Sequence, residues 1–393
     1  MRTNTQPKRL SYDHAKFVDR TDEVRLVLDK AHNLAVASFE DKRVVIFHGA
    51  RGAGKSWLLH EIEYQLKQTL PTVLTVYLDL AEFSAPPVDD AVWALITQIR
   101  GAIADRLGSS PLQTQQSESL SMLASVLIDG VKRVPVLLLL IDHVNESSRE
   151  MLALLEDRCL ELLAVEPRVL IVLAGRGREY TWKSMELRLR SEERELPYFD
   201  LAWTREQLKR HDPQLAQAAE EIQSLGAGYP WSNYILSVNQ ANRADALAQC
   251  IDFLIRDLPV SDDDRDHLEA LCVLNAISDE MLPRMFAAYY NDPTYLTWRY
   301  TQYREARQAL IRTTLVKWKE EMGGYVMDEA LSHVLEHWMY EHDRLIWERL
   351  HRAARDLFRD WADKYPRLAD HWQKEIEYHD ERLMHGPFWT PTP

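Results

Sequence analysis

The feature that most constrains this chain is a glycine-rich segment, GARGAGKS, at residues 49–56. It satisfies the pattern G-x-x-x-x-G-K-[ST], in which glycines let the backbone wrap around an oxyanion so that successive N–H groups point inward. The apolar run RVVIF precedes it and the amphipathic run SWLLHEIEYQL follows it. The motif therefore lies between a predicted strand and a predicted helix, whose positive end adds to the field at the loop. This context predicts a phosphate-binding loop (P-loop) and disfavours a glycine-rich turn without a ligand.

The motif assigns roles to its residues. We expect Lys55 to reach the β- and γ-phosphates of a nucleotide and Ser56 to ligate Mg²⁺. The predicted nucleotide contacts are Gly49, Ala50, Arg51, Gly52, Ala53, Gly54, Lys55, Ser56 and Trp57.

Composition excludes several classes of protein. With 393 residues, 46% of them hydrophobic and 27% charged, the chain is typical of a globular protein of two or three domains. Its net charge of −14 argues against a general binder of nucleic acid or anionic membranes, although a local basic patch stays open. Three widely spaced cysteines without a C-x-x-C favour a reducing compartment and no zinc framework. The start lacks a signal-peptide core and no apolar run could span a bilayer, so we predict a cytoplasmic protein without membrane contact.

Further apolar runs predict the fold of the first half. They are PTVLTVYLDLAEF (71–83), VPVLLLLID (134–142) and RVLIVLAGRG (168–177), with predicted helices between them, one from about residue 89 to 107. Continuous apolar strands that alternate with helices indicate a parallel sheet covered on both faces, the α/β fold of a P-loop NTPase. Ligands of such sheets bind at the carboxyl ends of the strands.

Two of these strand ends carry candidate catalytic residues. Asp142 ends LLLLID, where a P-loop protein holds the Mg²⁺ shell, so we predict Ser56 and Asp142 as metal ligands; a strand-terminal cap is the alternative. A hydrolase also needs a carboxylate to act on the attacking water, but the next residue is His143 and the nearest acid is Glu146. Arg176, after the next strand, can point at a γ-phosphate or can be an ordinary surface arginine. The predicted catalytic set is Lys55, Asp142, Glu146 and Arg176.

From about residue 200 the pattern becomes helical. We expect ELPYFDLAW (195–203) to form a short edge strand and Thr204 to cap the following helix, with a turn at GAGYP (226–230). After an acidic linker, LPVSDDD (258–264), three helices at 264–275, 279–290 and 302–313 precede a hairpin around Gly323-Gly324. Three helices and a hairpin predict a winged helix.

The tail from Leu331 is predicted to form long amphipathic helices broken at Pro366. His333 and His337 lie one helical turn apart but lack the glutamate of a zincin motif, so a solvated helix face is favoured over a metal site. Aromatic residues gather here, and a core is favoured over a docking surface. Seven of the twelve tryptophans fall in the last quarter of the chain: 298, 318, 338, 347, 361, 372 and 389.

The order of these motifs resembles the STAND class of AAA+-related ATPases, regulatory NTPases that include NB-ARC and NACHT proteins. The resemblance runs from about residue 17 to 340 and rests on FVDRTDEV (17–24), the P-loop, LLLLID, Arg176, ELPYFDLAWTREQ and GYP (228–230). It implies an ATP/ADP switch with Mg²⁺, in which Arg20 contacts the nucleotide, Pro230 packs on the adenine, and the winged helix closes over the nucleotide.

The chain also departs from this pattern. Asp19 stands where the family has glycine, His143 where many members have a second aspartate, and the wing lacks an evident nucleotide-sensing histidine. Slow hydrolysis, or none, is therefore expected. The large repeat array that usually follows as the sensor is reduced to a short helical tail, so recognition is assigned to another protein.

The predicted organisation and function follow. The domains are an N-terminal segment (1–40), a P-loop core (41–200), a helical lid (201–258), a winged helix (259–330) and a Trp-rich helical tail (331–393). The leading hypothesis is a switch ATPase in signalling or defence, whose nucleotide state controls opening and assembly with itself or a protein partner. One alternative is an AAA+ ATPase that acts on DNA, of the initiator or transposition-regulator type, which the acids in DDDRDHLEA and KEEMGGYVMDE disfavour. A small-molecule kinase is a weaker alternative, because no acceptor pocket is evident.

Overall fold

The computed structural model describes residues 11–83, 87–108, 119–177, 180–256 and 258–387. The chain divides into two compact units, residues 1–197 and 198–393. We call them unit 1 and unit 2.

Unit 1 is built on a parallel sheet of five strands in the order β2-β3-β4-β1-β5. Every residue of β3 and β4 is buried, because these interior strands are covered on both faces. The predicted α/β fold with a parallel sheet is confirmed. The strands are β1 (Val44–His48), β2 (Val73–Asp79), β3 (Val136–Asp142), β4 (Val169–Gly175) and β5 (Ser191–Glu195).

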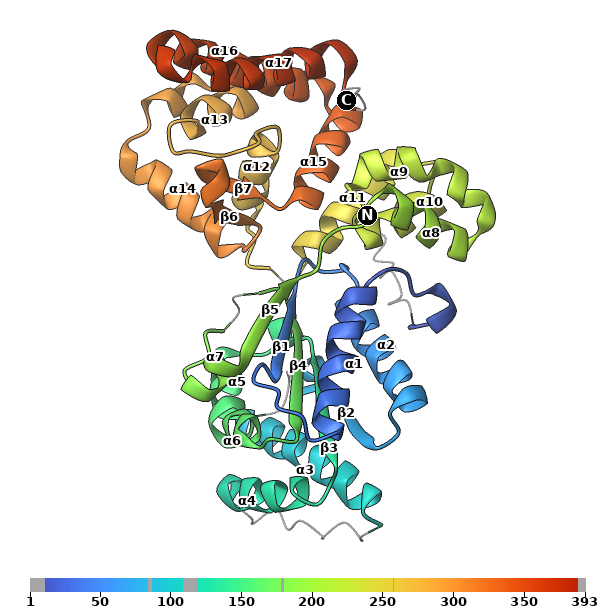
Figure 1. Ribbon diagram of the computed structural model, residues 1–393. Coiled ribbons are helices and arrows are strands. Elements are labelled where there is room, and N and C mark those ends of the chain that lie inside the picture. Colours follow the sequence, from blue (N-terminus) through green and yellow to red (C-terminus); the bar gives the residue numbers. More distant parts are fainter. Residues whose placement is uncertain (1–10, 84–86, 109–118, 178–179, 257, 388–393) are drawn as a thin grey trace. The chain divides into compact units, whose positions relative to one another are not determined.

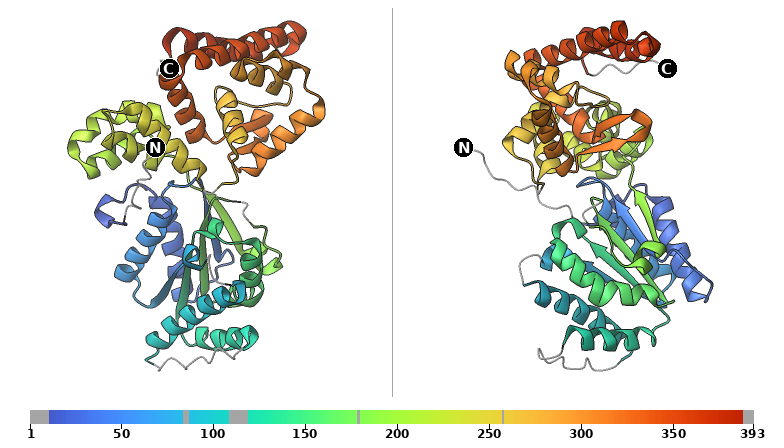
Figure 2. Two further views of the ribbon diagram at one scale, coloured as in Figure 1. Left: turned by 180° about the vertical axis from the view of Figure 1, so that it is seen from behind. Right: turned by 90° about the vertical axis from the view of Figure 1, so that its left-hand side faces the viewer.

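Helices cover both faces of this sheet (Figures 1 and 2). Successive side chains of β3 alternate between two hydrophobic cores: Leu138 and Leu140 pack with α1 and α2, whereas Leu137 and Leu139 pack with the core that contains α3. The helices of unit 1 are α1 (Thr21–Ala35), α2 (Lys55–Thr69), α3 (Val88–Arg106), α4 (Leu120–Val131), α5 (Arg149–Leu155), α6 (Glu161–Val165) and α7 (Met185–Arg190).

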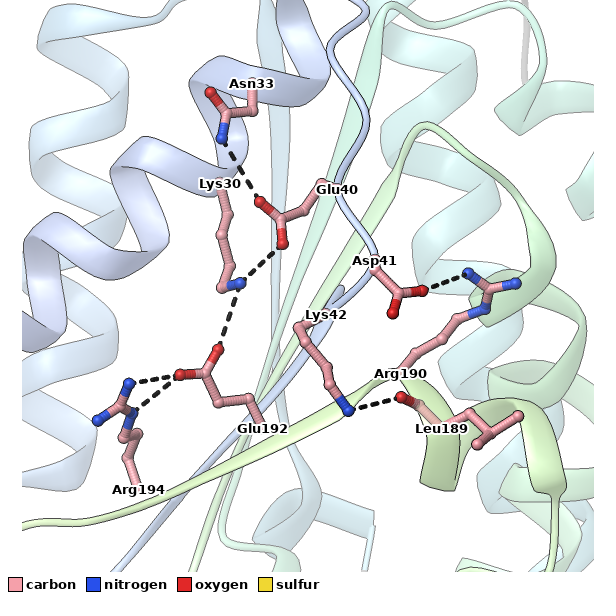
Figure 3. A network of polar contacts seen from close by, with 9 residues as sticks. All are labelled: Lys30, Asn33, Glu40, Asp41, Lys42, Leu189, Arg190, Glu192 and Arg194. Atoms are coloured by element: carbon pink, nitrogen blue, oxygen red, sulfur yellow. Dashed lines mark hydrogen bonds and ion pairs between the residues drawn. The ribbon is translucent and has the colours of Figure 1, made fainter.

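The edge strand differs from the prediction. Residues 195–203 were expected to form it, but β5 is Ser191–Glu195, four of whose five residues are charged, and a helix already begins at Leu201. A half-exposed edge strand needs no alternation of apolar and polar residues, so the hydrophobic pattern of the sequence does not predict it. Lys30 of α1 lies 2.8 Å from Glu40 and 3.3 Å from Glu192 of β5, and this buried amine ties the edge strand to α1 (Figure 3).

Unit 2 begins with α8 (Leu201–His211), α9 (Ala219–Gly226), α10 (Pro230–Val238) and α11 (Arg243–Ile255). The prediction that Thr204 caps the first helix is wrong. Asp200 caps α8 by accepting a hydrogen bond from the Trp203 N–H at 2.8 Å, and Thr204 lies one turn further on, fully buried against Gln223 and Asn233. Aspartate and threonine are both good caps, and only packing decides between candidates four residues apart.

The predicted turn at 226–230 is present between α9 and α10. Ala227 and Gly228 adopt positive φ angles of 49° and 72°, and Pro230 is the first residue of α10, the helical position that proline tolerates best. The Gly228 carbonyl accepts a hydrogen bond from the Phe199 N–H at 2.9 Å. This contact joins the turn to the start of unit 2.

Three helices and a hairpin follow in the predicted order. They are α12 (Asp262–Leu271), α13 (Leu282–Tyr290), α14 (Tyr300–Arg312), β6 (Val316–Lys319) and β7 (Gly324–Met327), with β6 and β7 antiparallel. Ile277, between α12 and α13, bridges to Tyr325 of β7 and fixes the hairpin to the helices. The acidic end of the predicted linker is not a linker. Ser261 and Asp264 form a capping box, and residues 262–264 are the first turn of α12, where the helix dipole favours acids.

The tail forms α15 (Glu329–His342), α16 (Arg344–Lys364) and α17 (Ala369–His385), with the expected break at Pro366. Of the seven tryptophans in the last quarter of the chain, Trp347 is fully buried, Trp318 is exposed, and 298, 338, 361 and 372 are half-buried; 389 lies outside the described residues. Among these described rings, only Trp347 is buried in the core. None of the described helices is long and apolar enough to cross a bilayer.

The predicted solvated face at His333 and His337 is wrong for His337, which is 1% exposed. His351 and His379 are also fully buried, with their Nδ1 atoms 2.8 Å apart, so one ring donates and the other accepts. Packing between helices buries these three rings, which the sequence of α15 alone does not indicate. The described residues contain no group of three or more His, Cys, Asp or Glu side chains that could hold a metal ion.

Acid is expected to destabilise these three helices. Burial lowers the pKa of His337 to about 4 and also lowers the pKa values of His351 and His379. The unfolded chain protonates such imidazoles below about pH 6.5, so their contribution to stability is present above that pH and is lost as the pH falls toward about 4. For His337 alone the loss at about pH 5 is on the order of 2 kcal/mol.

Hydrogen exchange of the α15–α17 amides at about pH 7 and about pH 5, corrected for intrinsic exchange, measures this loss. His337→Gln is expected to flatten the pH dependence, whereas His371→Gln, at an exposed position of α17, leaves it unchanged. Equal opening free energies at both pH values would contradict the prediction.

Candidate nucleotide-binding site

The P-loop lies where the sequence places it, between β1 and α2. Gly52 and Gly54 have φ angles of 83° and 93°, a backbone conformation that side chains disfavour, and Gly54 is the residue from which α2 starts. The first N–H groups of any α-helix have no partner within the helix, so the start of α2 is a position at which an anion can bind. The nine predicted contact residues, 49–57, are thus held in one loop and one helical turn.

Lys55 points into this loop. Its Nζ donates hydrogen bonds to the carbonyl oxygens of Gly49 at 2.8 Å and Ala50 at 2.7 Å, and the residue is 9% exposed. The positive charge is therefore already inside the cradle of backbone N–H groups. Such a loop fits a phosphate group, because both charge and donors converge on it.

The predicted metal ligands come from α2 and β3. Ser56 lies in the first turn of α2, a helix that packs against β2, β3 and β4, and Asp142 is the last residue of β3, 1% exposed. Asp142 Oδ2 accepts from the Tyr77 hydroxyl at 2.7 Å and Oδ1 accepts from the His143 N–H at 2.8 Å. Each carboxylate oxygen has a second lone pair, so these bonds orient Asp142 and leave it able to join a Mg²⁺ shell.

Sequence reasoning missed two residues at this edge, Tyr77 and Asp79 of β2. Asp79 is in register with Asp142 on the neighbouring strand, and His143 Nδ1 lies 2.7 Å from Asp79 Oδ1 and 3.6 Å from Asp142 Oδ2. The available signal was that YLD and LID end neighbouring parallel strands. His143 therefore lies between two carboxylates.

The electrostatics of His143 follow from this position. Burial lowers its pKa, but the hydrogen bond to Asp79 and the charges of Asp142, Asp79 and Glu146 outweigh burial, and the pKa is raised. Glu146 lies in the short turn 144–146, where its N–H donates to the His143 carbonyl at 2.8 Å. A histidine whose pKa is raised by its acidic neighbours thus stands where the resembled family often has a second aspartate.

Tyr77 also connects Asp142 to the P-loop helix. Its ring stacks on the ring of His60 of α2, with centroids 4.5 Å apart and planes at 15°. The ring of Tyr12 also lies beside His60, with centroids 5.4 Å apart. The Tyr12 hydroxyl donates to Glu61, a buried acid of α2, at 2.6 Å. Burial and the Asp142 charge raise the pKa of Tyr77, which keeps its hydroxyl a donor. Asp142 is therefore held by a chain of side chains that starts in the N-terminal segment.

Arg20 lies beneath the P-loop. It is 2% exposed, and its Nη2 donates to the carbonyl oxygens of Pro197 at 2.6 Å and Ala53 at 3.3 Å. These bonds give it a part in holding the loop, and the predicted contact with a nucleotide stays a prediction. Asp19 has a φ of 61°, so the aspartate adopts the left-handed backbone for which glycine is otherwise favoured.

Arg176 follows β4, which lies between β3 and β1, and is 9% exposed. Further along the chain, the buried acid Glu156 accepts hydrogen bonds from the Tyr180 hydroxyl at 2.6 Å and the Ser184 N–H at 2.7 Å. Lys55, Asp142, Glu146 and Arg176 thus all follow or end strands at the carboxyl edge of the sheet. Pro230 belongs to unit 2, and its contact with adenine stays a prediction.

No family model matches this chain, and no curated protein does. Among solved structures it is similar to the Aeropyrum pernix ORC2 protein, at 16% identity and a TM-score of 0.47, over 86% of this chain and 96% of that one. It is also similar to a STAND protein with a tetratricopeptide repeat sensor from Pyrococcus horikoshii (13%, 0.36, 95% and 56%) and to the Thermotoga maritima RuvB branch migration motor (15%, 0.38, 84% and 95%). Likenesses this distant do not specify what a chain binds.

The protein's own geometry defines its class. A five-stranded parallel sheet, a P-loop between β1 and α2 and an aspartate at the end of β3, followed by a helical C-terminal unit, form the α/β fold of a P-loop NTPase. Nucleotide binding is the property that this fold and this loop support.

Removing one hydroxyl should test the role of Asp142. Tyr77→Phe deletes the bond to Asp142 Oδ2 but keeps the ring on His60, so we expect the Mg²⁺ concentration needed for half-maximal ATP binding to rise about tenfold, with little change in metal-free nucleotide affinity. Asp142→Asn should give a larger effect in the same direction. Equal losses with and without Mg²⁺ would instead support a structural role. Tyr64→Phe, on the exposed side of α2, is the matched control.

Proposed function

We propose that this protein is an ATP- and ADP-binding switch ATPase that hydrolyses ATP slowly. The observation that carries the proposal is the P-loop itself, with the Lys55 ammonium seated between the Gly49 and Ala50 carbonyls. Asp142, oriented at the end of β3, supplies a carboxylate for Mg²⁺.

The residues divide the work as follows. Lys55 and the N–H groups of residues 49–56 would hold the phosphates, and Ser56 and Asp142 would hold Mg²⁺. Bound Mg²⁺ and nucleotide would supply the electrophilic γ-phosphate. Arg176, from the end of β4, would respond to the charge of that group. We base these roles on the position of each residue at or after the carboxyl end of a strand.

Slow turnover is supported by the residue after Asp142. The Asp79 carboxylate can only accept, so His143 Nδ1, 2.7 Å from Asp79 Oδ1, donates in this hydrogen bond and has no lone pair with which to accept a proton from water. Glu146 remains the candidate for orienting water. A weak hydrolase suits a switch, since each nucleotide state then persists long enough to be sensed.

The switch itself is the finer part of the proposal. ATP and ADP can favour different arrangements of the two units only if they differ in affinity for them. The candidate contacts are Arg176 in unit 1 and Pro230 and the hairpin around Asp328 in unit 2. We propose that nucleotide state governs assembly with itself or with a protein partner, as in signalling or defence. The resemblance of motif order to STAND ATPases supports this proposal.

Limited proteolysis tests the switch. Cleavage at Leu258–Val260, the part of the predicted linker that precedes the Ser261 cap, is expected to be slower with ADP than with a non-hydrolysable ATP analogue. Arg176→Ala should shrink this contrast without preventing binding, whereas Arg188→Ala, an exposed arginine of α7, should leave it intact. Identical cleavage in both nucleotides, with binding verified, would leave a nucleotide-stabilised scaffold.

A further inference from the structure

We infer that an apolar patch at the amino edge of the sheet, where its strands begin, is the surface through which two copies of this chain form a dimer. The inference concerns unit 1 and does not rest on nucleotide binding. The patch consists of exposed side chains from the segments that precede β1, β4 and β5, three neighbouring strands of the sheet. We call it the amino-edge patch: Val36, Phe39, Leu162, Val165, Met185 and Leu189.

Exposed apolar side chains of unit 1 are concentrated in this patch. Among the described residues of the unit, eight large apolar side chains are exposed, and six of them belong to the amino-edge patch. Phe39 is 86% exposed, more than any of the others. Single apolar side chains on a surface need no explanation, whereas a group of them marks a surface that contacts a partner.

Hydrogen bonds hold the three segments of the patch side by side. Lys42, in the loop before β1, donates to the Leu189 carbonyl oxygen at the end of α7, at 2.7 Å (Figure 3). The next residue, Arg43, donates to the carbonyl oxygens on either side of Val165, at 2.6 and 3.0 Å. The helices α6 and α7 also contact each other. The loop before β1 therefore lies against the ends of both helices, and the patch residues form one surface.

The two helices direct the patch residues away from the core. Leu163 of α6 and Leu187 of α7 are fully buried in the core of unit 1. The patch residues lie on the other sides of these helices. They are three residues apart in α6 and four apart in α7, so each pair shares one helix face.

The size of the patch fits a dimer contact. Its six side chains are between 41% and 86% exposed. At about 150–200 Å² for each side chain, they present on the order of 600 Å² of apolar surface. A standard interface buries about 800 Å² of each partner, and a little over half of that area is apolar. The amino-edge patch therefore contains enough apolar surface for a specific contact between two chains.

The charges around the patch favour a second copy as the partner. Residues 36–42, 161–168 and 183–192 contain six acids and five bases, a net charge of −1 in a chain whose net charge is −14. Within them, Arg190 already pairs with Glu186 at 3.0 Å and Asp41 at 3.8 Å. Such a balanced surface meets an identical one without repulsion, but it gives a strongly charged partner no complementary field. Twofold dimers of identical chains are also the commonest closed assemblies.

Sedimentation velocity of the full chain, between about 1 and about 100 µM, tests the inference. We expect the wild type to be dimeric at about 10 µM and above. The dimer should form equally with ADP, with a non-hydrolysable ATP analogue and without nucleotide, because the patch lies at the opposite end of the strands from the P-loop. Phe39→Ser/Leu189→Gln should raise the dissociation constant at least about 30-fold. These side chains are exposed, so the fold should persist.

Two further variants separate the patch from apolar surface in general. Leu162→Gln/Val165→Gln changes only α6 and should weaken the dimer as well. Leu345→Gln/Met384→Gln removes two side chains that are 77% and 69% exposed on α16 and α17, and it should change the dissociation constant less than twofold. None of these substitutions alters charge. Nucleotide affinity, measured on each variant, should stay at the wild-type value, which verifies that unit 1 is folded.

Hydroxyl-radical labelling locates the contact on the wild-type chain. Oxidation of Phe39 and Met185 should fall as the protein concentration rises from about 1 to about 100 µM, whereas oxidation of Met384 should not change.

Several outcomes would overturn the inference: a wild-type chain that stays monomeric at about 100 µM, a dimer that forms only with nucleotide, wild-type dissociation constants in both patch variants, an equal loss in the α16 and α17 control, or labelling of Met185 that does not depend on concentration. A monomeric wild type would assign the patch to a different protein. Each outcome leaves the proposal of nucleotide binding standing, since that is measured separately.

Discussion

Lys55→Ala is expected to reduce the affinity for MgATP by at least about 100-fold while leaving unit 1 folded. The side chain contributes the positive charge inside the P-loop, where its Nζ bonds the Gly49 and Ala50 carbonyls. Alanine removes that charge and two hydrogen bonds to main-chain oxygens but very little apolar contact. Calorimetric titration with ATP and Mg²⁺ measures the loss, and circular dichroism verifies the fold.

Lys67→Ala is the matched control for this prediction. Lys67 lies on the same helix, α2, where it is exposed and paired with Glu63 at 2.7 Å. An exposed pair of this kind contributes little stability, so the variant should bind MgATP as the wild type does. If Lys55→Ala itself kept near wild-type affinity, residues 49–56 would not be the phosphate site.

Gly228→Ala is expected to destabilise unit 2 by more than about 3 kcal/mol. A Cβ at this position would lie 1.8 Å from the carbonyl oxygen of Phe199, a main-chain atom that cannot turn aside, and the φ of 72° adds strain for any residue with a side chain. The turn between α9 and α10 and the start of α8 would have to separate. Urea unfolding of the full chain, with hydrogen exchange of α8–α11 to localise the effect, measures this.

Gly323→Ala separates the steric clash from the strain of a positive φ. Gly323 has a φ of 60°, but a Cβ there would meet nothing within 4 Å. This variant should therefore be destabilised only by the backbone strain of a positive φ, by about 1 kcal/mol in the free energy of unfolding. Equal losses in the two glycine variants would show that the close approach of Gly228 to Phe199 does not exist.

The core of unit 1 could be predicted because its signals are local. The P-loop is a contiguous motif, and the strands buried on both faces, β3 and β4, appear as unbroken apolar runs. The turn at 226–230 and the break at Pro366 follow from the φ preferences of glycine and proline. Asp142 could be placed because it ends such a run.

The rest depended on contacts between residues distant in the sequence. The edge strand β5 carries four charged residues and is a strand only because it pairs with β1. Tyr77 and Asp79 meet Asp142 and His143 through the register of β2 with β3. His337 is buried by packing against other helices, among them α9, whose Ser224 backbone bonds to it. Motifs and periodicity report the conformation of one segment, whereas pairing, burial and charge separation are properties of several segments together.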